Sequence, residues 1–249
     1  MIILGDIGNT VTKICIINNN NKVIKRILIP SNKVQIDKIN KLNKYFKNLN
    51  FSNVNKILFC SVVPSIFKDL KRYFKKKTKI RCFELKELNL KSLIKIDVNY
   101  KQVGSDRLAN AISVSNKKKN FIILDFGTAT TFDVLIGKNY KGGIISPGIE
   151  LSLNTLSNKA SLIPKINLLK MSKVIGKDTK SAVRAGFFWG YAGLIDNIIN
   201  LIKKETRKSF NTVITGGFSG LFKNSIKTKA KQDIDITING LIRASKLIK

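Results

Sequence analysis

Two short segments combine a carboxylate with residue types that can hold a phosphate group. DIGNTVTK at 6–13 and DFGTATTFD at 125–133 each lie between apolar runs and predict strand, turn and strand. In such a turn a glycine lets the backbone approach a ligand, and N–H, amide and hydroxyl groups donate to phosphate oxygens. The carboxylate suits the Mg²⁺ that accompanies ATP. An ordinary hairpin turn would explain either segment alone, but the matched pair favours phosphate binding.

The two segments also indicate an internal duplication. Asp6 aligns with Asp125, Gly8 with Gly127 and Thr12 with Thr131. Mixed helix and strand patterns follow each segment, so we predict two similar α/β domains, at 1–116 and 117–249, with a cleft between them. The chain contains neither GxxxxGK[ST] nor a GxGxxG after a strand, which argues against a P-loop protein and a dinucleotide fold.

A third segment, GSDR at 104–107, places Asp106 at the start of a predicted helix. The helix dipole there favours an ionised carboxylate. Because the chain has no histidine, a carboxylate is the expected base for a substrate hydroxyl. Asp106 could instead be a capping residue paired with Arg107, and the spacing supports both readings equally.

The apolar spacing predicts the elements that would position these segments. Strands are expected at 22–29, 55–64 and 79–85, and helices at 35–50, 65–77 and 181–205. The helix at 35–50 would bury Ile36, Ile39, Leu42, Phe46 and Leu49. A short strand and a helix are expected to close the chain at 233–248.

The composition is strongly basic, with 46 Lys and Arg against 15 Asp and Glu and a formal net charge of +31 over 249 residues. A nucleic-acid partner would be one explanation. Lys far outnumbers Arg, however, and Asn and Ile are abundant too, so we favour compositional drift and expect no nucleic-acid partner. The positive field would still attract an anionic substrate.

Other features exclude several classes of protein. The absence of histidine rules out a Ser-His-Asp hydrolase, a Cys-His protease and a His-ligated zinc site. Cys15, Cys60 and Cys82 have no paired spacing and are expected to be reduced thiols. No run of eighteen apolar residues and no signal peptide occur, so we expect a cytoplasmic protein without membrane contact.

Seven segments together resemble the type III pantothenate kinase family, in the family's order and over nearly the whole chain. They are DIGNTVTK at 6–13, CSVVP at 60–64, VGSDRLANA at 103–111, DFGTATTFD at 125–133, GGIISPG at 142–148, GKDT at 176–179 and TGG at 215–217. The resemblance implies an actin-like ATPase fold, which is a duplicated RNase H-like domain, in a homodimer. It implies phosphorylation of pantothenate with ATP, the first step of coenzyme A synthesis, with Mg²⁺ and a monovalent cation, K⁺ or NH₄⁺.

The resemblance also implies roles for individual residues. The ATP phosphates would be held by Asp6, Ile7, Gly8, Asn9, Thr10, Val11, Thr12 and Lys13, with Asp6 near Mg²⁺. Pantothenate would be bound by Gly104, Ser105, Asp106 and Arg107, with Asp106 as proton acceptor. Asp125 would ligate the monovalent cation, Thr128 would contact ATP, and Thr179 would reach pantothenate across the dimer.

The chain departs from the family pattern at three positions. Asp97 stands where many members have Tyr, Tyr100 where Pro is common, and Ser105 where Ala is usual. The Tyr contributes a pantothenate contact in the family, so that contact differs here.

Two alternatives remain open beside the kinase. One is a kinase for another small hydroxyl substrate, and the other is a non-catalytic, regulatory protein of this fold that binds nucleic acid. Asp6, Asp106 and Asp125 are all present in a chain with few acids, which favours a working kinase. The aromatic cluster at 187–191 could form an exposed face for dimerisation or belong to the core.

Overall fold

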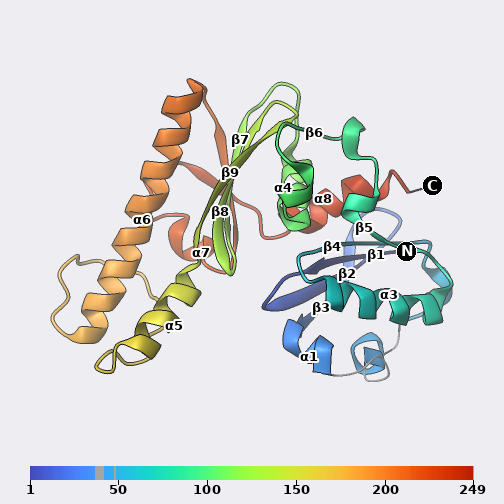
Figure 1. Cartoon of the computed structure of the whole chain (residues 1–249), viewed down its shortest axis with the longest axis horizontal. Helices are drawn as coiled ribbons and strands as arrows, with labels where there is room; N and C mark the ends of the chain where they lie inside the picture. Colours follow the sequence, from blue (N-terminus) through green and yellow to red (C-terminus); the bar gives the residue numbers. More distant parts are fainter. Residues whose placement is uncertain (37–41, 48, 249) are drawn as a thin grey trace. The chain divides into compact units, whose positions relative to one another are not determined.

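The computed structural model describes residues 1–36, 42–47 and 49–248. Contacts divide the chain into two compact units (Figure 1). Unit 1 is Met1–Ser115 with Asp235–Lys249, and unit 2 is Asn116–Ile234. The predicted ranges were 1–116 and 117–249, so the two divisions differ chiefly in the closing segment.

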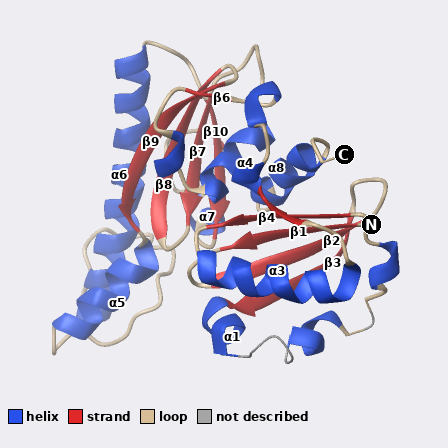
Figure 2. Ribbon diagram, turned by 45° about the vertical axis from the view of Figure 1, so that its right-hand side comes forward, coloured by secondary structure: helices blue, strands red, loops and turns tan. Residues whose placement is uncertain are grey.

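Unit 1 is built on a mixed sheet with the strand order β3-β2-β1-β4-β5 (Figure 2). The strands are β1 (Ile2–Ile7), β2 (Val11–Ile17), β3 (Val23–Pro30), β4 (Lys56–Ser61) and β5 (Cys82–Glu84). β1 pairs antiparallel with β2 and parallel with β4. The carboxyl ends of β1 and β4 therefore meet at the same edge of the sheet, and this edge carries the predicted site.

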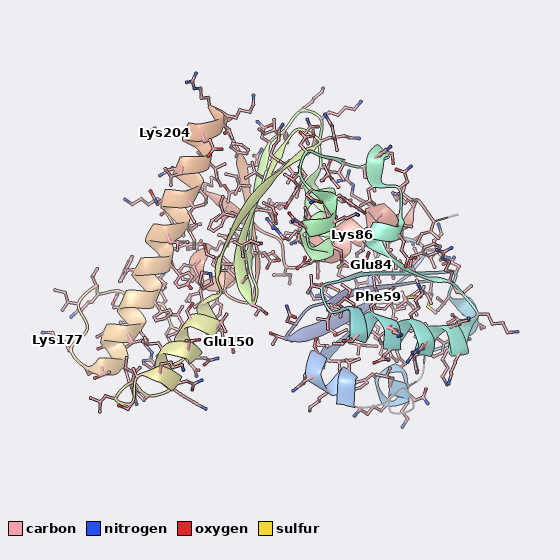
Figure 3. All side chains as sticks on the ribbon, in the orientation of Figure 1. Phe59, Glu84, Lys86, Glu150, Lys177 and Lys204 are labelled. Carbon is pink, nitrogen blue, oxygen red and sulfur yellow. The ribbon has the colours of Figure 1, made fainter. Side chains whose placement is uncertain are left out.

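The helices of unit 1 include α1 (Ser31–Ile36), α3 (Pro64–Thr78), α4 (Ser105–Val114) and α8 (Ile236–Ser245). Single-turn helices lie at η1 (Leu42–Phe46), η2 (Phe51–Asn53), η3 (Leu85–Glu87), η4 (Leu90–Ser92) and η5 (Tyr100–Gln102), with the short strand β6 (Lys95–Ile96). The prediction of one helix over 35–50 is wrong for its described residues: 35–36 end α1, 42–46 form the single-turn helix η1, and 49–50 are not helical. Ile39 lies outside the described residues. Within the sheet, Phe59 of β4 (labelled in Figure 3) is in register with Gly5 of β1, where a Cβ would come within 2.0 Å of the Phe59 ring.

The closing helix α8 packs on α4, which explains its place in unit 1. A Cβ at Gly240 would meet the carbonyl oxygen of Ala109 at 1.8 Å, so only glycine permits this close approach. The Thr237 hydroxyl donates to Asn110 Oδ1 at 2.7 Å, and Arg243 Nη1 donates to the Ser113 carbonyl at 2.8 Å.

The strands of unit 2 pair with one another in the order β11-β10-β7-β8-β9. The strands are β7 (Phe121–Phe126), β8 (Ala129–Ile136), β9 (Asn139–Pro147), β10 (Asn211–Gly216) and β11 (Ala230–Gln232), and the helices are α5 (Ile149–Lys159), α6 (Thr179–Thr206) and α7 (Ser219–Phe222). The long predicted helix is confirmed as α6, which begins at a capping box formed by Asp178 and Ser181. In the described part of the chain, no helix has the length and apolar character needed to cross a membrane.

The aromatic cluster on α6 belongs to the core of unit 2. Phe188 is fully buried, and Phe187, Trp189 and Tyr191 are partly buried against the same core. The reading of this cluster as an exposed face is therefore wrong, because its rings are packed within the unit.

The two β-turn-β segments match in structure, with one difference from the sequence alignment. Asp6 lies opposite Lys13 in the β1–β2 pair, whereas Asp125 lies opposite Thr131 in the β7–β8 pair. The second turn is one residue shorter. Gly8 N–H donates to the carbonyl of Val11, three residues on, but Gly127 N–H donates to Ala129, two residues on. The alignment of Thr12 with Thr131 is thus corrected: Thr12 corresponds to Thr130.

Candidate active site

The GSDR segment is fastened to the carboxyl edge of the unit 1 sheet by Ser105. The Ser61 N–H at the end of β4 donates to Ser105 Oγ at 2.8 Å, and Ser105 Oγ donates back to the Ser61 carbonyl at 3.1 Å. These bonds bring the first turn of α4, and with it Asp106, to the edge where Asp6 lies on β1. The structure thus brings together two carboxylates that are a hundred residues apart in sequence.

Asp6 is held in an environment that disfavours its charge. Burial, and next the like charge of Asp106, raise its pKa from 3.8 to about 6, while Lys13 and a hydrogen bond from Cys60 act in the opposite direction. Cys60 Sγ donates to Asp6 Oδ1 at 3.5 Å. Burial and the neighbouring carboxylates raise the pKa of the Cys60 thiol well above its ordinary value, so it stays a protonated donor.

The pKa of Asp106 is also raised, but its causes differ from those at Asp6. Burial raises its pKa, and the backbone N–H and guanidinium of Arg107 oppose the shift. The Arg107 N–H donates to Asp106 Oδ1 at 2.8 Å. A Cβ at Gly104 would lie 2.4 Å from the same oxygen, so this glycine leaves room for the carboxylate to fold back over the helix start. A partly buried carboxylate with a raised pKa is suited to accept a proton.

The β1–β2 turn is braced from behind by Ser31, a residue that the sequence did not single out. Its backbone N–H donates to the Thr10 carbonyl at 2.9 Å, and its hydroxyl donates to the Gly8 carbonyl at 2.6 Å. Its Oγ lies 3.0 Å from Thr12 Oγ1, and both side chains are buried. Asn9, Thr10 and Val11 are exposed on the other side of the turn. The turn is therefore fixed on its inner side and open to a ligand on its outer side.

In unit 2 the corresponding carboxylate has different neighbours. Asp125 on β7 lies in register with Thr131 of β8 and Thr215 of β10, so the three side chains share one face of the sheet. The equivalent partners of Asp6 are Lys13 and Cys60. Asp125 is thus set among hydroxyl groups, which are ligands for a hard cation, whereas Asp6 already has an ammonium group nearby. Thr128 is exposed in the adjoining turn, and Thr179 is exposed at the first position of α6.

Comparison with known proteins assigns the chain to a family. A family model for type III pantothenate kinase matches residues 2–201. The type III pantothenate kinase of Pelagibacter ubique is 66% identical over 251 residues, covering 100% of both chains. The chain belongs to the type III pantothenate kinase family. Another member, from Sulfurihydrogenibium sp., is 34% identical and covers 97% of this chain and 98% of its own.

Solved structures at low identity support the fold of this type III pantothenate kinase family member. A Campylobacter jejuni protein, provisionally assigned as a Baf family transcriptional activator, gives a TM-score of 0.64 at 19% identity and covers 98% of this chain and 97% of its own. A Sinorhizobium meliloti protein, provisionally assigned as a 2-dehydro-3-deoxygalactonokinase, gives 0.62 at 9% identity and covers 100% and 99%. The predicted duplicated, actin-like α/β fold is confirmed.

In this pantothenate kinase family member, a cavity of about 410 Å³ adjoins the GSDR segment. Gly104, Ser105 and Val62 line it together with the charged side chains of Glu84 and Lys86. Glu84 Oε2 accepts the backbone N–H of Lys86 at 2.6 Å, and the two residues lie beside each other in Figure 3. The cavity therefore has the size of a small-molecule site and a cation on its wall.

Replacement of Ser31 by Ala tests whether the bracing of the turn serves ATP binding. The change keeps the backbone bond to Thr10 but removes the hydroxyl that holds the Gly8 carbonyl. Because one hydrogen bond is lost, we expect the KM for ATP to rise about 3- to 10-fold while the KM for pantothenate changes less than about twofold. Steady-state kinetics with each substrate varied in turn measures this split.

Thr12→Val removes the link to Ser31 from the other side and serves as the matched variant. The double variant should be no worse than the poorer single variant, because both changes act on one network. A loss of thermal stability with both KM values unchanged would contradict a role for Ser31 in positioning the turn.

Proposed function

We propose that Asp106 is the general base of the pantothenate kinase reaction and that the β1–β2 turn holds the phosphates of ATP. The chain is an ATP-dependent phosphotransferase of the type III pantothenate kinase family, which forms 4′-phosphopantothenate in the first step of coenzyme A synthesis. The observation that supports these roles is the meeting of Asp106 with Asp6 at one edge of the unit 1 sheet, where burial raises the pKa of both carboxylates.

Each residue of this edge has a distinct part in the proposal. Asp106 accepts the proton of the primary hydroxyl of pantothenate as its oxygen attacks the γ-phosphorus in line. The exposed positions of the turn, Asn9 and Thr10, donate to phosphate oxygens, and Lys13 supplies positive charge beside them. Arg107 and the wall of the 410 Å³ cavity orient pantothenate. Thr128 makes a further contact with ATP.

The residues present fit a divalent cation beside ATP. Asp6 carries a carboxylate whose ionisation is opposed by burial and by the charge of Asp106, and a bound cation would relieve both costs. Mg²⁺ in kinase sites is held by one or two carboxylates together with substrate phosphates. When bound, Mg²⁺ neutralises charge on the transferring phosphoryl oxygens.

Asp125 is the proposed ligand of a monovalent cation, K⁺ or NH₄⁺. Its neighbours in register, Thr131 and Thr215, offer oxygen atoms on the same face of the sheet. None of these three side chains carries a positive charge that would compete with the ion. The donor chemistry therefore fits a cation with oxygen ligands.

A homodimer is the proposed assembly, and the cytoplasm, where ATP is supplied, is the proposed location. Large apolar side chains are exposed along one segment of unit 2, at Leu151, Leu162, Leu169, Val174 and Ile175. Apolar side chains left exposed along a segment are available to an interface with a second copy. Thr179 lies four residues after Ile175, which supports a contact with pantothenate bound to a second copy.

The decisive experiment measures ADP release from the purified chain with Mg-ATP, with and without pantothenate, in K⁺ or Na⁺ buffer. We expect release that requires pantothenate and is at least about tenfold faster in K⁺. Asp125→Asn should remove the difference between the two buffers, while Glu150→Gln, an exposed carboxylate of the same unit, should retain it.

Other results would redirect the assignment. ADP release without dependence on pantothenate, from a chain shown to be folded, would point to another hydroxyl substrate. No ADP release with any such substrate would favour a non-catalytic role. Equal rates in K⁺ and Na⁺ would remove Asp125 from cation binding and leave the kinase itself in place.

A further inference from the structure

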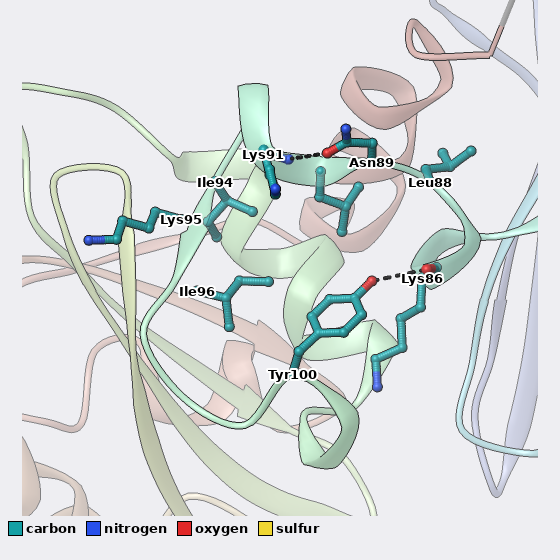
Figure 4. A pocket seen from close by; sticks show the side chains of 9 residues that line it. Lys86, Leu88, Asn89, Lys91, Ile94, Lys95, Ile96 and Tyr100 are labelled. Carbon is teal, nitrogen blue, oxygen red and sulfur yellow. Dashed lines mark hydrogen bonds between the residues drawn. The ribbon is translucent and has the colours of Figure 1, made fainter.

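A larger cavity lies in unit 1 within residues 86–100, and we call it the η3–η5 cavity (Figure 4). Its volume is about 590 Å³, within the range of small-molecule sites. Leu88, Leu90, Ile94 and Ile96 supply apolar walls. Such walls favour an occupant with an apolar body, since burying its surface removes it from water.

The charged side chains that line the η3–η5 cavity are all lysines, and one of them, Lys95, has its Nζ 3.5 Å from Oδ1 of Asp97 beside the lining. Lys86, Lys91 and Lys95 line it, and none of the nine lining residues is acidic. Lys86 Nζ donates to the Lys101 carbonyl at 3.2 Å and lies 5.2 Å from the centre of the Tyr100 ring, so its positive charge lies beside the wall that Tyr100 forms. An occupant should therefore carry a negative charge as well as an apolar body.

Tyr100 connects the wall of the cavity to the backbone of Lys86. Its hydroxyl donates to the Lys86 carbonyl at 3.1 Å, as the dashed line in Figure 4 shows. Burial and the charge of Glu84 raise the pKa of Tyr100, which keeps the hydroxyl a neutral donor.

A series of hydrogen bonds connects the backbone of Lys86 to Ser105, the residue before Asp106. Glu84 accepts the backbone N–H of Lys86 at 2.6 Å and that of Ser61 at 3.3 Å, and Ser61 N–H also donates to Ser105 Oγ at 2.8 Å. Lys86 lines both the η3–η5 cavity and the smaller cavity beside GSDR. An anion that attracts Lys86 into the larger cavity would thus withdraw positive charge from the smaller one.

We propose that the η3–η5 cavity binds a small organic anion with an apolar body, and that this binding opposes pantothenate binding through Lys86. The binding part stands on the cavity alone. The coupling part rests on the proposed function, because it assumes that pantothenate occupies the smaller cavity beside GSDR.

The binding part is tested with 8-anilinonaphthalene-1-sulfonate, a fluorescent anion with an aromatic body, titrated into the full chain. Leu88→Trp fills the cavity and should weaken binding at least about tenfold. Lys91→Glu, at an exposed position, should weaken it about 3- to 10-fold. Lys68→Glu makes the same charge change on exposed α3, outside the cavity, and should leave the affinity within about twofold. Circular dichroism and thermal unfolding identify any variant that fails to fold.

Equal binding by the wild type, Leu88→Trp and Lys91→Glu would overturn the proposed site, as would an equal loss in Lys68→Glu. Neither result depends on turnover, so a failure here is distinct from a failure of the kinase assignment.

The coupling part is tested by repeating the titration at increasing pantothenate. The dissociation constant of the probe should rise about 3- to 10-fold and then level off, because two linked sites have a finite coupling. A rise without limit would mean competition for one site, and no rise would mean no coupling. Either outcome would overturn the link through Lys86 while leaving the binding result in place.

Discussion

Replacement of Asp106 by Asn is expected to lower kcat about 10²- to 10⁴-fold, the usual contribution of a positioned acid or base. Asn keeps the size of the side chain and can still accept the N–H of Arg107, which donates to Oδ1 at 2.8 Å. It cannot take a proton from the pantothenate hydroxyl. The dissociation constant for Mg-ATP should stay within about threefold of the wild-type value, since the turn residues are untouched. Single-turnover kinetics and equilibrium ATP titration separate the two quantities.

The pH dependence gives a second readout for Asp106. A base works only when ionised, so the wild-type rate should rise with pH through the pKa of this carboxyl. Burial raises that pKa above its ordinary value of 3.8, which shifts the acidic limb toward neutral pH. The two carboxylates interact, so the limb reports the pair Asp6 and Asp106.

Asp69→Asn provides the control for Asp106→Asn. Asp69 is a partly exposed carboxylate on α3 that lies 3.7 Å from Arg72, and its replacement should leave both the rate and the pH profile unchanged. Turnover near the wild-type value in Asp106→Asn would exclude it as the base.

The sequence predicted the elements whose signals are local. The two β-turn-β segments and helix α6 follow from apolar spacing, glycine and capping residues that are close together in the chain. The motif residues Asp6 and Asp106 could also be named from sequence, because their residue types and turns point to chemistry. Their separate motifs carry no information about the distance between them.

Features that depend on distant contacts could not be predicted in the same way. Helix α8 joins unit 1 because Gly240 fits against Ala109, which lies more than a hundred residues earlier. Ser31 braces the phosphate turn through hydrogen bonds to Gly8 and Thr12, yet a serine after a strand is an ordinary turn residue. The raised pKa of Asp6 likewise requires the burial and the neighbouring charge that only the folded chain provides.

Replacement of Asp6 by Asn is expected to stabilise the chain at neutral pH while weakening Mg-ATP binding. Without Mg²⁺ and ATP, the folded chain raises the pKa of Asp6 from 3.8 to about 6. Between these values the folded state binds more protons than the unfolded state, so the contribution of Asp6 to stability falls as pH rises. Asn does not ionise in this pH range. The variant should therefore gain stability over the wild type between about pH 4 and pH 6 and keep a gain of order 1–3 kcal/mol above that range.

Urea unfolding of the wild type and of Asp6→Asn at pH 4.5, 6 and 8, without metal or nucleotide, measures the difference in unfolding free energy. Asp69→Asn serves as the control. The same variant should bind Mg-ATP about 10²-fold more weakly, because the carboxylate proposed to face the cation is gone. A stability difference that does not grow with pH would contradict the raised pKa. A gain in stability with unchanged Mg-ATP affinity would place the cation elsewhere. If both expectations hold, the charge that destabilises the empty site is the same charge that binds the nucleotide complex, which is the trade-off expected where a fold keeps a buried carboxylate for catalysis.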